Sequence, residues 1–78
     1  MDTATFPQAL AEVVKNSLTE AGVSRRDAAD LTGIPLTTLS RRLTGNSPFL
    51  STELDRIASV TGTTVSALVS AAEQRSAA

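Results

Sequence analysis

RRDAADLTGIPLTTLSRRLTG, residues 25–45 of the chain, has the pattern of two short helices joined at a glycine corner. Ser24 comes directly before the stretch and suits an N-cap, and Asp27 stands three residues later, in the first turn that acidic residues favour. Gly33 then ends the first helix, because glycine tolerates the left-handed conformation that follows many helices. The pattern therefore predicts a helix from about residue 25 to the residue before Gly33.

A second helix is predicted from Pro35 to Thr44, with Gly45 closing it. Proline suits a first helical turn, and the leucines of this segment recur at spacings of three and four, which places them on one face. These leucines are Leu36, Leu39 and Leu43. The opposite face carries Thr37 and Arg41, flanked by Thr38, Ser40, Arg42 and Thr44. A helix this short is marginal alone, so we expect the rest of the chain to hold it in place and display its polar face.

This stretch resembles the helix-turn-helix domains of the repressor and Cro proteins of lambdoid phages and of their bacterial relatives. The landmarks that carry the resemblance are Ala29 where two helices would cross, Gly33 at the corner, Ile34 after it and Leu39 in the second helix. Arg42 departs from the pattern, since that position is usually apolar in the family. Leu43 is therefore expected to make the inward contact, while Arg42 turns toward solvent or phosphate.

The resemblance implies that the second helix enters the major groove of double-stranded DNA. The positions that read base edges in the family are occupied here by Leu36, Thr37, Ser40 and Arg41. Leu36 could equally belong to the core or touch a thymine methyl group. Phosphate contacts are expected from Arg25, Arg42, Thr44, Asn46 and Ser47, and from backbone amides near Ser24 at a helix start. The position of Arg25 also implies that it braces a side chain of the second helix.

These polar residues have ordinary structural explanations as well. The pair Arg41–Arg42 could be a solvated face, and the pair Arg25–Arg26 could form ion pairs with Asp30 or with a neighbouring helix. Asp27 and Asp30 form a carboxylate pair only in the sense that they lie three residues apart. Capping and solvation explain them better than acid–base chemistry, because no nucleophile, metal-ligand set or phosphate loop accompanies them.

Composition limits the class of protein. With 78 residues, the sequence is expected to form one domain with a modest core. It has no cysteine and no histidine, which disfavours disulfides, thiolate or imidazole catalysis and the usual zinc ligands, so we expect no enzyme, no metal and no cofactor. No membrane span and no signal peptide are recognisable, and a cytoplasmic protein is expected. The formal net charge is only −1, yet no acidic residue lies between Leu31 and Thr52.

The flanking segments predict a compact all-α bundle of five short helices. Residues 1–6 are expected to form a flexible arm, 7–72 the helix-turn-helix domain and 73–78 a frayed tail. The first helix should run from Pro7 to about Ala21, with Leu10, Val13, Val14 and Leu18 inward. The fourth should be capped by Ser51 or Thr52 and end at Gly62, and the fifth should be capped by Thr63 or Thr64.

The fifth helix carries an apolar stripe, Val65, Leu68, Val69 and Ala72. One interpretation is that the stripe packs within the small core. The other is a homodimer interface, which the resemblance favours, because repressors of this kind pair through C-terminal helices to reach successive major grooves. A monomer on an asymmetric site remains a third alternative.

The sequence therefore predicts a sequence-specific DNA-binding regulator of transcription, of the phage immunity or Cro repressor type, that acts by excluding polymerase from a promoter. Its partner would be a double-stranded DNA operator, with no membrane and no small-molecule substrate. A repressor-like module that binds another protein is the alternative class. Within the DNA-binding class, an antitoxin or an excision factor would have much the same sequence features.

Overall fold

The computed structural model describes residues 5–77 and contains five helices, which confirms the predicted all-α fold. The helices are α1 (Phe6–Glu20), α2 (Arg25–Thr32), α3 (Leu36–Leu43), α4 (Ser51–Thr61) and α5 (Val65–Ala77). Within the described residues no helix is both long and apolar enough to cross a membrane.

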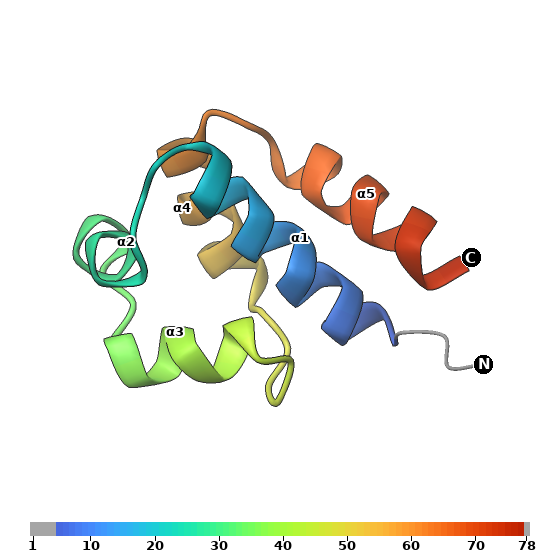
Figure 1. The fold of residues 1–78 in the computed structure, drawn as a ribbon, viewed down its shortest axis with the longest axis horizontal. Helices are drawn as coiled ribbons and strands as arrows, with labels where there is room; N and C mark the ends of the chain where they lie inside the picture. Colours follow the sequence, from blue (N-terminus) through green and yellow to red (C-terminus); the bar gives the residue numbers. More distant parts are fainter. Residues whose placement is uncertain (1–4, 78) are drawn as a thin grey trace.

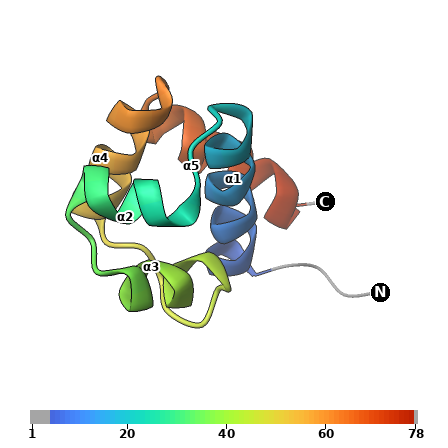
Figure 2. The same ribbon diagram turned by 60° about the vertical axis from the view of Figure 1, so that its left-hand side comes forward.

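Helix α1 forms the centre of the arrangement. Helix α5 runs back alongside it, whereas α3 lies across the lower edge of the molecule, away from α5 (Figure 1). Turned by 60°, the ribbon shows α2 packed above α3 and beside α4 (Figure 2). Helix α3 therefore has one side against the bundle and one side free.

The core is built from apolar residues of all five helices. Leu39 of α3, Ile57 of α4 and Val14 of α1 are the largest side chains that are fully buried. The other buried members are Ala9, Leu10, Val13, Leu18, Ala28, Ala29, Ile34, Leu43, Leu54, Ala58, Leu68 and Ala72. Both leucines that hold α3 to the bundle, Leu39 and Leu43, are thus inward as predicted. Leu36 is not, since 40% of it remains exposed.

Three helix starts differ from the sequence interpretation, and the first is that of α3, which begins at Leu36 with Pro35 as its N-cap. Helix α1 begins at Phe6 with Thr5 as its N-cap, because the Thr5 hydroxyl accepts a hydrogen bond from the Gln8 N–H and the Gln8 side chain accepts one from the Thr5 N–H. Thr5 and Phe6, which were predicted to belong to the arm, thus form the start of α1. Residues 1–4 of the predicted arm lie outside the described residues. Helix α4 begins one or two residues earlier than expected, with Leu50 rather than Ser51 or Thr52 as the cap. Leucine has no side-chain acceptor, so only the return bond exists, from the Leu50 N–H to the Glu53 carboxylate at 2.9 Å.

Three helices end in a threonine–glycine pair whose hydroxyl bonds back to the preceding turn. The hydroxyl of Thr32 donates to the Ala28 carbonyl at 2.6 Å, that of Thr61 to the Ile57 carbonyl at 2.8 Å, and that of Thr44 to the Arg41 carbonyl at 2.9 Å. A glycine with positive φ follows each threonine. Each hydroxyl thus adds a second hydrogen bond to a carbonyl of the last helical turn, the usual back-bonding of threonine within a helix.

The glycines that end α2 and α3 should respond differently to alanine. Both have positive φ, +76° at Gly33 and +82° at Gly45, which costs an alanine about 1 to 2 kcal/mol. At Gly33 an added Cβ would meet only the Arg56 Nη1 atom at 3.8 Å, whereas at Gly45 it would meet Gln8 Cγ at 3.2 Å and Gln8 Cα at 3.4 Å. We expect Gly45→Ala to lower the free energy of unfolding in urea by more than Gly33→Ala does. Equal losses would show that Gln8 moves aside freely.

Candidate nucleic-acid interface

Helix α3 presents a polar, cationic surface to solvent. Leu39 and Leu43 anchor its inner side, and the residues that point away from them, Thr37 and Arg41, are exposed. The Arg41 guanidinium has no hydrogen bond or ion pair with any residue between 5 and 77. Its five donors are therefore available to an external acceptor.

Arg25 lies at the start of α2 and reaches the middle of α3. Its Nη1 atom donates to the Ser40 hydroxyl at 3.4 Å, at the long limit for a hydrogen bond. The predicted bracing contact between these helices is therefore present. Because a guanidinium has several donors, Arg25 can hold Ser40 and still offer N–H groups to an anion.

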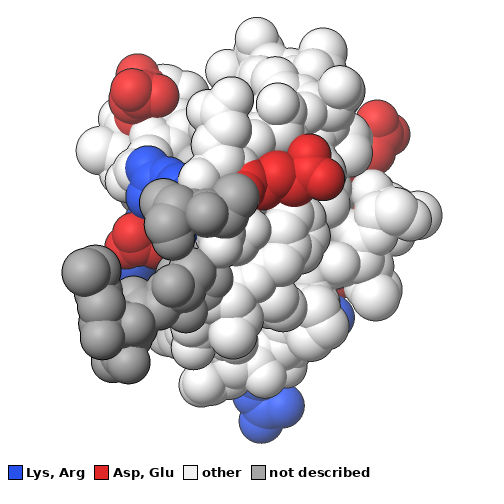
Figure 3. Space-filling model, turned by 90° about the vertical axis from the view of Figure 1, so that its right-hand side faces the viewer, with Lys and Arg blue, Asp and Glu red and all other residues white. Residues whose placement is uncertain are grey.

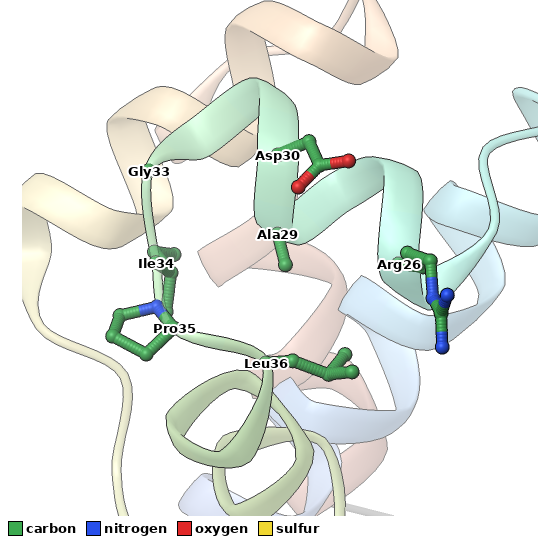
Figure 4. Close-up of a pocket in the computed structure, with 7 residues that line it drawn as sticks. All are labelled: Arg26, Ala29, Asp30, Gly33, Ile34, Pro35 and Leu36. Carbon is green, nitrogen blue, oxygen red and sulfur yellow. The ribbon is translucent and has the colours of Figure 1, made fainter.

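A cleft of about 640 Å³ separates the outer side of α2 from the beginning of α3. Leu36 extends from α3 toward the side of α2 that carries Ala29 and Arg26 (Figure 4). Asp30 lines the same cleft, but within the described part of the chain it forms no ion pair with Arg26. Of the two interpretations of Leu36, core or contact residue, its exposure favours a contact residue.

Ser24 and the loop after α3 hold the remaining candidate phosphate contacts. The Ser24 hydroxyl accepts a hydrogen bond from the Asp27 N–H at 3.1 Å, so it serves as the predicted N-cap of α2. In the loop, Asn46 is exposed and Ser47 half-buried, whereas the hydroxyl hydrogen of Thr44 is committed to the Arg41 carbonyl. Asn46 is thus the freest of these side chains to donate to an external anion.

Arg42 does not turn toward solvent, which corrects the sequence interpretation. Its Nε donates to Glu53 Oε1 at 2.8 Å and its Nη2 to Glu53 Oε2 at 3.3 Å. Only 17% of the Arg42 side chain and 11% of the Glu53 side chain are exposed. Arg42 is therefore tied to α4 by a two-point ion pair and is no free phosphate ligand.

Two residues of this region were missed by sequence reasoning. Neither Glu53 nor Arg56 is among the site residues that the sequence predicts. In the structure Arg56 Nη1 donates to the Thr32 carbonyl at 3.2 Å and so ties α4 to the end of α2. A signal for Glu53 did exist, since an arginine at a usually apolar position requires a partner.

Basic residues dominate the edge of the molecule near α3. Helix α3 and its flanking loops contain no acidic residue, Glu53 is neutralised by Arg42, and Asp30 of α2 lines the cleft at the start of α3. In the view from the right-hand side of Figure 1, the charged group that protrudes from the lower edge is basic, and the acidic side chains of that face lie higher (Figure 3). The weakly acidic net charge thus conceals a local excess of positive charge.

Helix α5 mostly completes the core of a single chain. Leu68 and Ala72 are buried, and Val65 and Val69 are half-buried. For Leu68 and Ala72 this agrees with the interpretation that the stripe packs within the core, and it leaves Val65 and Val69 as the stripe residues with surface for a dimer contact. Helix α5 also continues through the expected tail to Ala77, and its Arg75 pairs with Glu12 of α1 at 3.2 Å.

The Glu53 carboxyl should make stability depend on pH. Burial alone would raise the pKa of Glu53, but the hydrogen bonds from Arg42 and Leu50 and the positive charges of Arg42 and Arg56 outweigh it and lower that pKa. A lowered pKa stabilises the fold above the unfolded value, about 4.3 for glutamate, and this contribution disappears as pH falls through the folded value. We expect Glu53→Gln to cost about 1 to 3 kcal/mol of unfolding free energy at neutral pH. That cost should shrink in urea titrations as the pH falls below about 4. A constant difference would contradict this role.

Comparison with known proteins adds two findings. The sequence model of a family described as "BetR domain" matches residues 5–78. Among solved structures, the clp gene regulator ClgR from Corynebacterium glutamicum superposes with a TM-score of 0.89 over 97% of this chain and 81% of that chain, at 20% sequence identity. The chain thus shares the fold of that protein. No curated protein sequence matches it.

Proposed function

This chain belongs to the BetR domain family, and from that premise we propose that it is a regulator of transcription that binds double-stranded DNA in a sequence-specific way. The observation that carries the proposal is the outer face of α3, where the exposed Thr37 and Arg41 stand on a helix anchored by two buried leucines, and Arg41 has no partner among residues 5–77. The protein whose fold it shares is named a gene regulator, which supports the same conclusion.

In this proposal α3 lies in the major groove. Arg41 donates to one guanine, Thr37 and Ser40 contact neighbouring base edges, and Leu36 packs on a thymine methyl group. Arg25 contacts phosphate while it holds Ser40 in position, and the exposed Asn46 and the first turn of α2 add further phosphate contacts. Arg42 is left out because Glu53 already holds it.

We further propose the repressor or Cro type of regulation, in which the bound domain excludes polymerase and does no chemistry itself. Two copies would place their α3 helices about 34 Å apart on a two-fold symmetric operator. A dimer contact through the α5 stripe would use the half-buried Val65 and Val69, since the other stripe residues are inside the core.

Selection of bound duplexes from a random pool tests the proposal most directly. We expect one enriched sequence, and its symmetry reports whether one or two copies bind. Affinity for that duplex should then fall log-linearly with salt, by about 0.9 units of slope for each phosphate contacted. No enrichment, together with a salt-independent apolar partner, would instead identify a protein-interaction module.

A further inference from the structure

We propose that Glu53 limits the sequence-independent affinity of the domain for DNA without touching DNA, by holding Arg42 in an internal ion pair and keeping it off the phosphate backbone. The inference rests on the proposed function. It adds a residue of α4 to the determinants of that function, and it assigns the ion pair a role beyond stability.

The Glu53 carboxylate joins three parts of the fold at once. It accepts from Arg42 Nε and Nη2 of α3, at 2.8 and 3.3 Å, and from the Leu50 N–H that leads into α4, at 2.9 Å. Both charged side chains are mostly shielded from water. The arginine is thus fixed by two donors to a carboxylate that is itself fixed to the backbone.

Arg42 occupies a sensitive position. It directly follows Arg41, and the loop with Asn46 begins two residues later. It stands on the flank of α3 between the buried leucines and the exposed face, and the DNA backbones run along both flanks of a helix in the major groove. A released guanidinium on this flank would find phosphate, which carries charge but no sequence information.

The internal pair should persist on DNA. A bidentate arginine–carboxylate pair is strong, and moving Arg42 to phosphate would leave the shielded Glu53 carboxylate without its partner. The positive charges facing Glu53 are those of Arg42 and Arg56, and they favour its ionised form. Arg42 therefore adds no sequence-independent affinity while Glu53 is present.

Glu53→Gln tests the ion pair with Arg42 separately from the hydrogen bond with the Leu50 N–H. The amide oxygen can still accept from the Leu50 N–H, so the entry to α4 is kept, but Arg42 loses its charged partner. We expect affinity for random duplex to rise several-fold at low salt and the salt slope to steepen by about 0.9. The gain should shrink about three-fold to four-fold between about 50 and 200 mM salt. Affinity for the selected duplex should rise by about the same factor, because a phosphate contact carries no sequence information.

Two matched variants control for charge and for folding. Asp55→Asn removes the same unit charge from an exposed position of the same helix and should leave the random-duplex slope unchanged. Arg42→Gln combined with Glu53→Gln leaves a neutral pair and should bind random duplex like the unchanged protein. All anisotropy titrations are run well below the lowest melting temperature, which circular dichroism supplies for each variant.

Three results would overturn the inference. Glu53→Gln could weaken both duplexes in proportion to its lost stability with no change of slope, which would make the pair structural only. The double variant could lower the slope by about one unit, which would mean that Arg42 already contacts phosphate. Asp55→Asn could reproduce the gain, which would make it a general effect of charge. If the unchanged protein bound no duplex, the proposed function would fail first and this inference with it.

Discussion

Leu39→Ala should lower the free energy of unfolding by about 2 to 5 kcal/mol, the range for truncating a buried leucine. Leu39 is fully buried and is one of only two side chains that α3 inserts into the core. A domain of this size has a total stability of about 5 to 10 kcal/mol, so the variant should melt about 10 °C or more below the unchanged protein. DNA affinity should fall as well, because α3 would lose half of its anchor.

Leu31→Ala is the matched control for that change. Leu31 is also a helical leucine, but 64% of it is exposed, so its truncation removes little buried surface. We expect a change within about 0.5 kcal/mol, measured by urea unfolding alongside Leu39→Ala. Similar losses for the two leucines would mean that α3 does not pack on the bundle as described.

Arg41→Ala should cost about 1 to 3 kcal/mol of binding free energy on the selected duplex and much less on random DNA. The reason is geometric: Arg41 is exposed beside Thr37 and unpaired within the described residues, so its guanidinium can meet two acceptors of one guanine. Preference at one base pair of each half-site should relax. Fluorescence anisotropy on both duplexes across a salt series measures both effects.

Two arginine variants sharpen this experiment. Arg41→Lys keeps the charge but loses the two-pronged geometry, so it should preserve binding to random DNA and still lose specificity. Arg25→Ala should weaken both duplexes and lower the salt slope by about one unit, because a phosphate contact carries no sequence information. Its bond to Ser40 adds a smaller loss on the selected duplex alone. If Arg41→Ala weakened both duplexes equally, base reading by Arg41 would have to be abandoned.

Much of this fold could be predicted because its signals lie within one helical turn of the residues they affect. Ser24 caps α2 and Gly33 ends it with positive φ, as their neighbours along the chain indicate. The spacing of Leu39 and Leu43 places both inward. The spacing of the apolar residues also exposes Thr37 and Arg41 on the opposite face, so the candidate recognition surface follows from periodicity.

The tertiary structure decided which distant groups meet. Leu36 fits the leucine spacing, yet it lies where α3 begins and projects into the cleft beside α2, beyond the edge of the core. Leu68 and Ala72 fit a dimer stripe equally well, but α5 packs along α1 and buries them. Periodicity defines a face of a helix, and only the packing of the other helices determines what covers that face.

Arg42 shows most clearly the difference between what local sequence determines and what packing determines. By itself the sequence determined that an arginine stands on the flank of α3 with no acidic residue nearby along the chain, and that pattern suggested a phosphate contact. Its partner, Glu53, comes eleven residues later, across a loop and on another helix. A charge pairs with whatever the fold brings within a few ångströms, and no local periodicity encodes that distance. The helices and their faces were therefore determined locally, whereas the packing of α3 against α4 decided which of its arginines are free.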